Sequence, residues 1–146
     1  MPINQQLPAE AHETLLKNPE AIYLDVRTEA EFSAGHPEGA INIPVVFIKG
    51  PGQMEVNPDF LAVAEKVLPK NKKLVVGCMA GGRSQRACEM LEEAGYTDLT
   101  NVRGGFGGQR DASGALVVKG WRDSGLPTST EISANSYQVQ RKKAGL

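Results

Sequence analysis

Apolar and polar residues follow two different spacings along the chain, and the spacing predicts which segments are strands and which are helices. Short, largely apolar runs at residues 21–26 and 74–76 are typical of strands that are buried on both faces of a sheet. Apolar residues recur at helical spacing in longer segments, which predicts helices at residues 8–16, 58–67 and 84–94. Strands and helices therefore alternate along the chain.

Weaker patterns predict the remaining elements. An edge strand is expected at residues 40–46, where Pro44 interrupts the run, and a last strand is expected at residues 96–102. A short helix is expected at residues 28–34. Residues 47–55 contain glycine and proline, and we predict a long loop there that forms one wall of a pocket.

The strand at residues 74–76 runs into a cysteine, a pair of glycines and the start of a helix. The two glycines allow the backbone to curl with its N–H groups pointing inward, and the helix adds the positive end of its dipole. These groups and a nearby guanidinium stabilise a thiolate over a thiol. Cys78 is therefore a candidate nucleophile, and the alternative is a buried structural cysteine at the end of a strand. The residues expected to surround its sulfur and bind the substrate are Met79, Ala80, Gly81, Gly82, Arg83 and Ser84.

Asp25 and Arg27 come at the carboxyl end of the strand at residues 21–26, the edge at which open parallel sheets place their sites. A buried carboxylate needs hydrogen-bond donors, so we expect Asp25 to support the loop by accepting from Ser84 or from the loop amides. Arg27 lies four residues before Glu31. Two interpretations of this spacing remain open, a surface ion pair and a shared role in fixing the loop.

The other cysteine and the two histidines are given structural roles. Cys88 lies on the apolar stripe of the helix at residues 84–94, so we predict a core residue rather than a redox partner of Cys78. No spacing of cysteine and histidine completes a metal site, so neither His12 nor His36 is predicted to bind a metal.

Several motifs of the chain occur in the same order in a known family. The loop Cys78-x-x-Gly81-x-Arg83-Ser84 follows one hydrophobic strand, and Asp25-Val26-Arg27 follows another. Further matching segments are Glu31-Phe32, Gly35-His36-Pro37, Gly39-Ala40-Ile41-Asn42-Ile43-Pro44, Ala94-Gly95-Tyr96, Asn101-Val102-x-Gly104-Gly105 and Gly125-Leu126-Pro127. Together these motifs resemble the single-domain rhodanese-like (thiosulfate sulfurtransferase) family over about residues 6–127.

The resemblance implies an α/β fold of the rhodanese-like, three-layer type, in which a central parallel sheet of about five strands is flanked by helices. It implies one domain at residues 1–127, and the polar residues 128–146 are then expected to form a tail that is mobile or serves for docking. It also implies that Cys78 carries sulfur as a persulfide, with neither a metal nor an organic cofactor.

The chain departs from the family's pattern after its Gly-Gly pair at positions 104 and 105. The family's usual tryptophan is absent there, and two residues are candidates to replace it. Phe106 follows the glycines directly, whereas Trp121 comes after an insertion at residues 109–119.

The composition limits the possible partners. The chain has 146 residues, enough for a single domain, and a formal net charge of −1. Because acidic and basic residues are interspersed, we expect binding neither to nucleic acid nor to a membrane. No apolar stretch approaches the ~18 residues of a membrane span, and the N-terminus has no basic or apolar leader. We therefore expect a cytoplasmic monomer or weak homodimer that acts on small sulfur donors and thiol acceptors, or on a protein acceptor.

The predicted mechanism is a double displacement. The Cys78 thiolate takes the outer sulfur of thiosulfate or of a persulfide and passes it to cyanide, a thiol or a protein. The alternatives are a sulfur-binding relay or regulatory module, and a phosphatase or arsenate reductase with a Cys-x5-Arg loop. Only four residues separate Cys78 from Arg83, which disfavours an oxyanion loop. The sequence leaves open whether Arg83 faces the pocket or braces the loop, and the absence of a basic residue between them favours a persulfide donor over thiosulfate.

Overall fold

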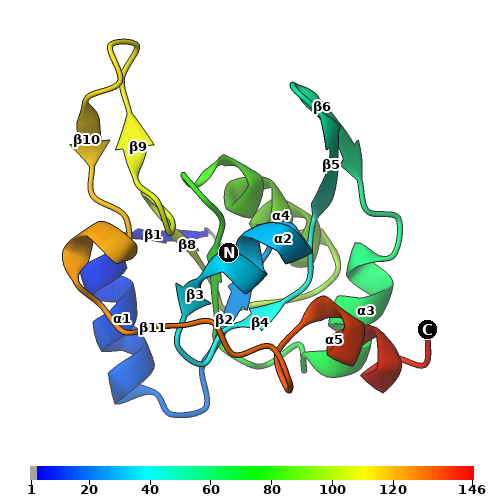
Figure 1. Ribbon diagram of the computed structural model, residues 1–146. Coiled ribbons are helices and arrows are strands. Elements are labelled where there is room, and N and C mark those ends of the chain that lie inside the picture. Colours follow the sequence, from blue (N-terminus) through cyan, green and yellow to red (C-terminus); the bar gives the residue numbers. More distant parts are fainter. Residues whose placement is uncertain (1–2) are drawn as a thin grey trace.

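The computed structural model describes residues 3–146 of the chain. Within these residues, the central sheet contains five parallel strands in the order β1-β8-β7-β2-β4 (Figure 1). They are β1 (Asn4–Gln6), β8 (Leu99–Val102), β7 (Leu74–Gly77), β2 (Ile22–Asp25) and β4 (Ile41–Asn42). The predicted parallel sheet is confirmed, although β1 was not predicted because its residues are polar and mostly exposed at the edge of the sheet.

Helices cover both faces of this sheet. One face carries α1 (Pro8–Lys17) and α2 (Glu29–Ala34), and the other carries α3 (Phe60–Val67), α4 (Gly82–Glu93) and α5 (Tyr137–Lys143). Neighbouring residues of a strand point to opposite faces, so Tyr23 and Leu24 of β2 enter different cores. This is why β2 and β7 are apolar along almost their whole length. The predicted three-layer α/β fold is confirmed.

Local sequence signals set the boundaries of the helices. Thr28 caps α2, because its hydroxyl accepts a hydrogen bond from Glu31 N while the Glu31 carboxylate accepts one from Thr28 N. Pro8 occupies the first turn of α1, where its missing N–H costs nothing. Pro69 follows the end of α3, which it cannot continue.

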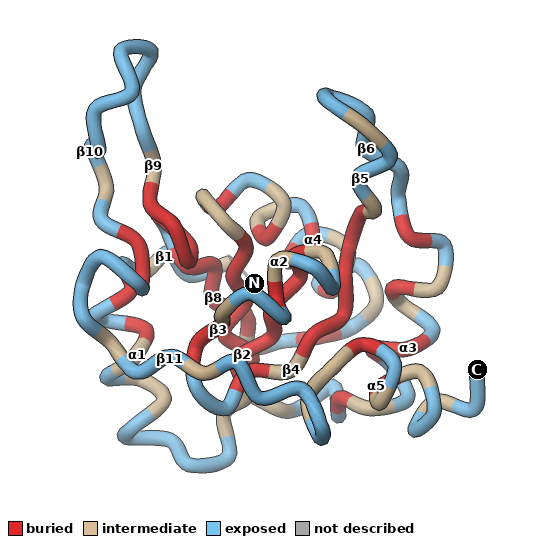
Figure 2. Tube along the Cα trace, viewed as in Figure 1, coloured by how far each residue is buried: buried red, intermediate tan, exposed pale blue. Residues whose placement is uncertain are grey.

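Two segments expected to be irregular form β-hairpins. Residues 47–55, predicted as a loop, belong to the hairpin of β5 (Val46–Gly50) and β6 (Gln53–Val56). The prediction was wrong because Gly52, with φ +68°, turns the chain tightly and lets two strands pair across it. The insertion forms a second hairpin, β9 (Gln109–Arg110) and β10 (Leu116–Val118). The outer parts of both hairpins are exposed (Figure 2).

Residues 128–146 were expected to form a mobile or docking tail, and this expectation was wrong. The segment begins with β11 (Thr128–Ser129), which pairs with β3 (His36–Pro37), and ends with α5 packed against α3 and β4. Tyr137 is the anchor: its ring is buried in the core and its hydroxyl accepts a hydrogen bond from Asn57 Nδ2 at 2.9 Å. A short 3-10 helix, η1 (Arg122–Ser124), precedes this segment.

Candidate active site

The parallel strands bring four segments of the chain to one edge of the sheet. Segments that follow the carboxyl ends of parallel strands emerge at the same edge, where α/β sheets form their sites. Cys78 follows β7 directly, and Asp25 is the last residue of β2, opposite Gly77 in register. The hairpins β5–β6 and β9–β10 follow β4 and β8, and they rise on either side of residues 78–84, which we call the Cys78 loop (Figure 1).

The Cys78 loop directs hydrogen-bond donors at the sulfur. Cys78 is 2% exposed, and its Sγ accepts a hydrogen bond from Gly81 N at 3.0 Å. Gly81 has φ +115°, a backbone conformation that residues with a Cβ rarely adopt, and this conformation turns its N–H back toward the cysteine. The helix α4 begins at the next residue, so its positive end also lies beside the sulfur. The arrangement favours negative charge on Sγ.

A second segment, residues 104–108, holds the Cys78 loop from outside. Phe106 N donates to the carbonyl of Cys78 at 2.8 Å, and Gly107 N donates to the carbonyl of Met79 at 2.9 Å. A Cβ on Gly105 would collide with the carbonyl oxygen of Cys78 and with the backbone of Met79, so only glycine allows this close approach. The carbonyls of the loop are therefore bound on the outside, while Gly81 N faces the sulfur.

Ser84 is the second polar group at the sulfur. Its hydroxyl lies 3.4 Å from Cys78 Sγ, 3.2 Å from the carbonyl of Gly81 and 2.5 Å from Asn101 Oδ1. Asn101, on β8, was missed as a site residue although it lies in a family motif, because the motif does not say what its side chain contacts. The predicted placement of Ser84 beside Cys78 holds, and Asn101 holds Ser84 in place.

Asp25 and Arg27 form a buried pair with each other, and each is 1% exposed. The Asp25 carboxylate accepts hydrogen bonds from Arg27 N, Nε and Nη2 at 2.7 to 3.1 Å. The expectation that Asp25 accepts from Ser84 or the loop amides was wrong, because Arg27 takes up both carboxylate oxygens. The interpretation of Arg27 and Glu31 as a surface pair was also wrong, because Arg27 turns inward to Asp25 and to the carbonyl of Gly35.

Glu31 instead binds the Cys78 loop. Its carboxylate accepts from both Nη atoms of Arg83, at 2.7 and 3.0 Å, and both side chains are mostly buried. Burial alone would raise the pKa of Glu31, but hydrogen bonds from Arg83 and Thr28 and the charge of Arg83 lower it to about 2. Arg83 therefore braces the loop through its guanidinium and does not present a free charge to a substrate.

The other predicted loop residues add no charge. Met79 and Ala80 are half-buried, and the Met79 side chain lies against Gly107. Gly82 is exposed at the first position of α4, and a Cβ there would contact nothing within 4 Å. The structure thus brings Gly81 N to the sulfur by a hydrogen bond and the Ser84 hydroxyl to within 3.4 Å of it, whereas Met79, Ala80 and Gly82 shape the loop.

Cys88 is a core residue, as predicted. It is fully buried on the face of α4 that packs against the sheet, and both cysteines are free thiols. Burial, followed by the charges of Glu89, Cys78 and Glu92, raises the pKa of the Cys88 thiol to about 12. A thiol with such a pKa stays protonated and is a poor nucleophile near neutral pH.

Both candidates for the missing tryptophan are buried, in different places. The Phe106 ring lies 4.4 Å below the Arg27 guanidinium carbon, beside the Cys78 loop. Trp121 packs edge-on against Tyr23 and His12, under α1. Phe106 is therefore the aromatic residue of the site, and Trp121 is part of the core. His36, stacked on Phe32, is likewise structural.

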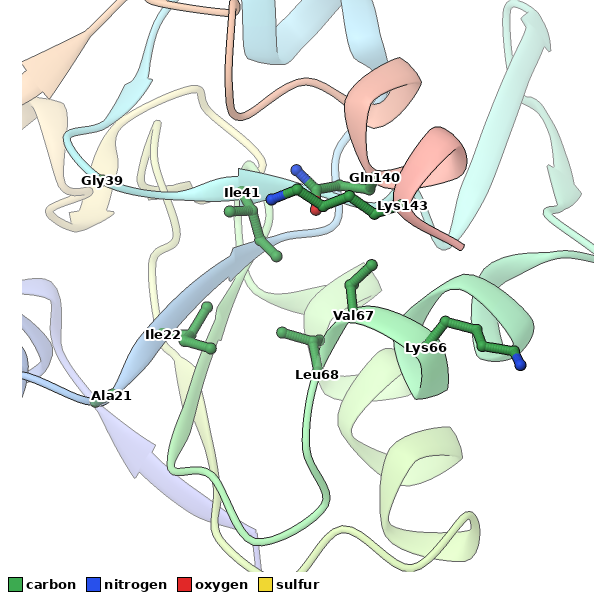
Figure 3. Close-up of a pocket in the computed structure, with 9 residues that line it drawn as sticks. All are labelled: Ala21, Ile22, Gly39, Ile41, Lys66, Val67, Leu68, Gln140 and Lys143. Carbon is green, nitrogen blue, oxygen red and sulfur yellow. The ribbon is translucent and has the colours of Figure 1, made fainter. Parts of the chain in front are cut away.

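A large surface hollow lies elsewhere. Its volume is about 420 Å³ and it opens between α3, α5 and the amino ends of β2 and β4, the edge opposite Cys78 (Figure 3). Its lining residues are Ala21, Ile22, Gly39, Ile41, Lys66, Val67, Leu68, Gln140 and Lys143. Among residues 3–146, no cluster of His, Cys, Asp and Glu is placed to hold a metal ion, and no helix is long and apolar enough to cross a bilayer.

Comparison with known proteins places this geometry in a family. The family model of the Rhodanese-like domain matches residues 8–111. Thiosulfate sulfurtransferase 16, chloroplastic, of Arabidopsis thaliana is 39% identical over 118 residues, which cover 81% of this chain and 86% of that protein. Protein HIGH ARSENIC CONTENT 1, mitochondrial, of the same plant is 46% identical over 90 residues, which cover 62% of this chain and 53% of that protein. The chain thus spans about half the length of the second relative.

A solved structure agrees with these sequence matches. The crystal structure of Rv0390 from M. tuberculosis superposes with a TM-score of 0.75 at 33% sequence identity, covering 90% of this chain and 100% of that one. The resemblance inferred from the motifs is confirmed by the family model, by the sequence of a relative over most of its length and by the fold. This chain belongs to the rhodanese-like domain family.

Proposed function

We propose that this protein is a rhodanese-type sulfurtransferase in which Cys78 carries a sulfane sulfur as a persulfide. The observation that carries the proposal is the hydrogen bond from Gly81 N to Cys78 Sγ, with the Ser84 hydroxyl at 3.4 Å from the same sulfur. Donors that converge on a sulfur at the start of a helix stabilise a thiolate and also a persulfide anion. Similarity to a relative named thiosulfate sulfurtransferase supports the same reaction class.

Both half-reactions balance without an added oxidant or base. With thiosulfate as donor, the Cys78 thiolate attacks the outer sulfur, the donor's S–S bond breaks, and its electron pair leaves with sulfite. The product is Cys–S–S⁻. An acceptor such as cyanide or a thiolate then attacks the outer sulfur and leaves as thiocyanate or a persulfide, while the electron pair of the broken bond returns to Cys78. Because thiolates start both steps, no histidine base is required.

The position of Arg83 argues against the phosphatase and arsenate reductase alternatives. Those reactions need the loop arginine to bind the oxyanion. Here both Nη atoms of Arg83 are bound to Glu31, and only four residues separate it from Cys78. One relative carries the words high arsenic content in its name, so arsenate belongs among the substrates to be tested.

Steady-state kinetics test the proposed function. With thiosulfate or a persulfide as donor and cyanide or a thiol as acceptor, we expect double-displacement kinetics, that is, parallel lines in double-reciprocal plots at several acceptor concentrations. An aryl phosphate and arsenate, offered under the same conditions, should turn over far more slowly. Faster turnover of either oxyanion would overturn the proposal, and the absence of any sulfur transfer would favour a regulatory or relay module.

The partners and the location follow the same proposal. We propose that the protein takes sulfur from small donors and passes it to thiols or to a protein acceptor. We also propose that it is a monomer or a weak homodimer. A location in the cytoplasm stays a prediction, since the names of two relatives place those proteins in chloroplasts and mitochondria.

A further inference from the structure

Two arginines of the site are already paired with carboxylates. Arg27 is paired with Asp25, and Arg83 is paired with Glu31. Residues 79–82 between Cys78 and Arg83 contain no ionisable side chain. A donor that carries a negative group besides its sulfane sulfur would therefore find no free cation within the Cys78 loop itself.

A free cation lies against the segment that holds the Cys78 loop, shortly after the end of the insertion. Arg122 begins η1, directly after the β9–β10 hairpin, and its guanidinium carbon lies 5.5 Å from the centre of the Phe106 ring. A Cβ built on Gly107 would lie 3.4 Å from Arg122 Nη2 and 2.5 Å from Met79 Sδ. Arg122 and the Met79 side chain therefore converge on Gly107, whose N–H binds the Met79 carbonyl.

The hairpin contacts the Cys78 loop at its other end as well. Gln109 opens β9, and its side-chain Nε2 lies 3.7 Å from the place that a Cβ on Gly81 would take. The insertion thus begins with Gln109 beside Gly81 of the Cys78 loop, and the chain that follows it places Arg122 against residues 106 and 107, which hold that loop. The tip of the hairpin is exposed.

Arg122 is exposed, and no ion pair among residues 3–146 involves it. The neighbouring carboxylate of Asp123 is turned away, since its Oδ2 accepts a hydrogen bond from Gly120 N at 3.0 Å. The only interaction of the Arg122 guanidinium within this part of the chain is with the Phe106 ring. Its N–H groups are therefore available to an oxyanion, which a guanidinium binds through two parallel hydrogen bonds.

We propose that Arg122 binds the second anionic group of the sulfur donor and so selects donors, such as thiosulfate, that carry an oxyanion beside the sulfane sulfur. The inference rests on the proposed sulfur transfer at Cys78 and assigns its donor specificity to Arg122, which follows the insertion. Arg122 supplies the positive charge that residues 79–82 lack. The absence of a basic residue from those positions therefore does not disfavour thiosulfate as the donor. Arg122 acts on binding of the donor and not on the acceptor half-reaction.

Two sulfur donors and variants at two arginines distinguish a role of Arg122 in donor binding from a general effect on the fold or on net charge. The Arg122→Gln variant is compared with Arg110→Gln, because Arg110 lies on the nearby β9–β10 hairpin and its side chain donates to the carbonyl of Gly114 at the exposed tip. Thiosulfate is compared with an alkyl persulfide that has no other anionic group, at low ionic strength and with one acceptor. Initial rates give KM and kcat for each donor.

For Arg122→Gln we expect the KM for thiosulfate to rise about tenfold, with kcat and the KM for the alkyl persulfide almost unchanged. Arg122→Lys should recover part of the thiosulfate KM, and Arg110→Gln should match the unsubstituted protein. Equal changes for both donors, or the same change in Arg110→Gln, would overturn the inference. A protein that uses the alkyl persulfide but not thiosulfate would overturn it and leave the proposed function standing, whereas failure with both donors would overturn both.

Discussion

Cys78 and Cys88 belong to the same strand–helix unit and are both nearly inaccessible, yet their surroundings differ in kind. Cys78 Sγ meets a backbone N–H, a hydroxyl and the start of α4. Cys88 meets only the apolar core, and burial raises the pKa of its thiol to about 12. The comparison teaches that burial in an apolar core keeps a thiol protonated, and that convergent polar groups at a strand end set Cys78 apart from Cys88.

Among substitutions around the sulfur, the largest effect on sulfur transfer is expected from moving the N–H that faces Cys78. Gly81→Ala places a Cβ on a residue at φ +115°, so the backbone must rotate to relieve strain of about 1–3 kcal/mol. We expect kcat/KM for sulfur transfer to fall at least about tenfold, equivalent to ~1.4 kcal/mol. The matched control is Gly82→Ala, where a Cβ meets open space. Equal losses in the two folded variants would contradict a role for the Gly81 N–H.

A smaller effect is expected from the hydroxyl at the sulfur. Ser84→Ala removes the group 3.4 Å from Cys78 Sγ and leaves Asn101 Oδ1 without its short hydrogen bond. We expect kcat/KM to fall several-fold and unfolding to cost about 1–3 kcal/mol less, because a buried acceptor is left unpaired.

The control for this variant is Ser136→Ala, which removes the N-cap of α5, far along the chain from the loop. It should lower stability by about 1 kcal/mol with sulfur transfer unchanged. If Ser84→Ala loses stability and keeps full activity, then the hydroxyl supports only the fold. Thermal unfolding and initial rates, measured on both variants, decide between these results.

A still smaller effect on the rate is expected from breaking the ion pair of Glu31 and Arg83, which supports the Cys78 loop. Glu31→Gln weakens the pair with Arg83, and we expect kcat/KM to fall about two- to threefold. The pKa of Glu31 is lowered from 4.5 to about 2 in the folded protein, so its contribution to stability is present above about pH 4.5 and is lost as the pH falls toward 2.

The acid unfolding of the two proteins measures that contribution. Followed by circular dichroism, the unsubstituted protein should lose stability more steeply between pH 4.5 and 2 than Glu31→Gln, which has no carboxylate to protonate. Identical acid profiles would show that the Arg83–Glu31 pair does not stabilise the fold.

The smallest effect on sulfur transfer is expected from a substitution of Cys88, the second cysteine of the comparison. Cys88→Ala removes a buried sulfur and should lower stability by about 1 kcal/mol through the small cavity it leaves. Sulfur transfer should be unchanged. A loss of activity as large as that of Gly81→Ala would mean that Cys88 takes part in the reaction.

The site was predictable where its determinants are local. The apolar strand, the glycine pair and the helix start all lie within residues 74–84, and their pattern alone predicts a loop that directs N–H groups at Cys78. The parallel sheet followed in the same way from the family motifs and from the buried character of β2 and β7. Their interior position requires apolar residues on both faces.

Two of the errors arose where a partner lies far along the chain. The spacing of Arg27 and Glu31 suits a pair on one helix, yet Arg27 precedes α2 and turns back to Asp25, which frees Glu31 for Arg83 on α4. Residues 128–146 looked like a tail because their composition is polar, and Tyr137 became an anchor only through its contact with Asn57. Neither partner can be read from spacing or composition.

The most direct test of the central claim is the intact mass of two single-cysteine variants after exposure to a sulfur donor. Cys88→Ala, which keeps Cys78, should gain the mass of one sulfur atom with thiosulfate or an alkyl persulfide and lose it when cyanide is added. Cys78→Ser, which keeps Cys88, should gain none under the same conditions, because its remaining thiol is buried and protonated. Sulfur loading of folded Cys78→Ser to the same extent as Cys88→Ala would contradict the assignment of Cys78 as the residue that carries the sulfur.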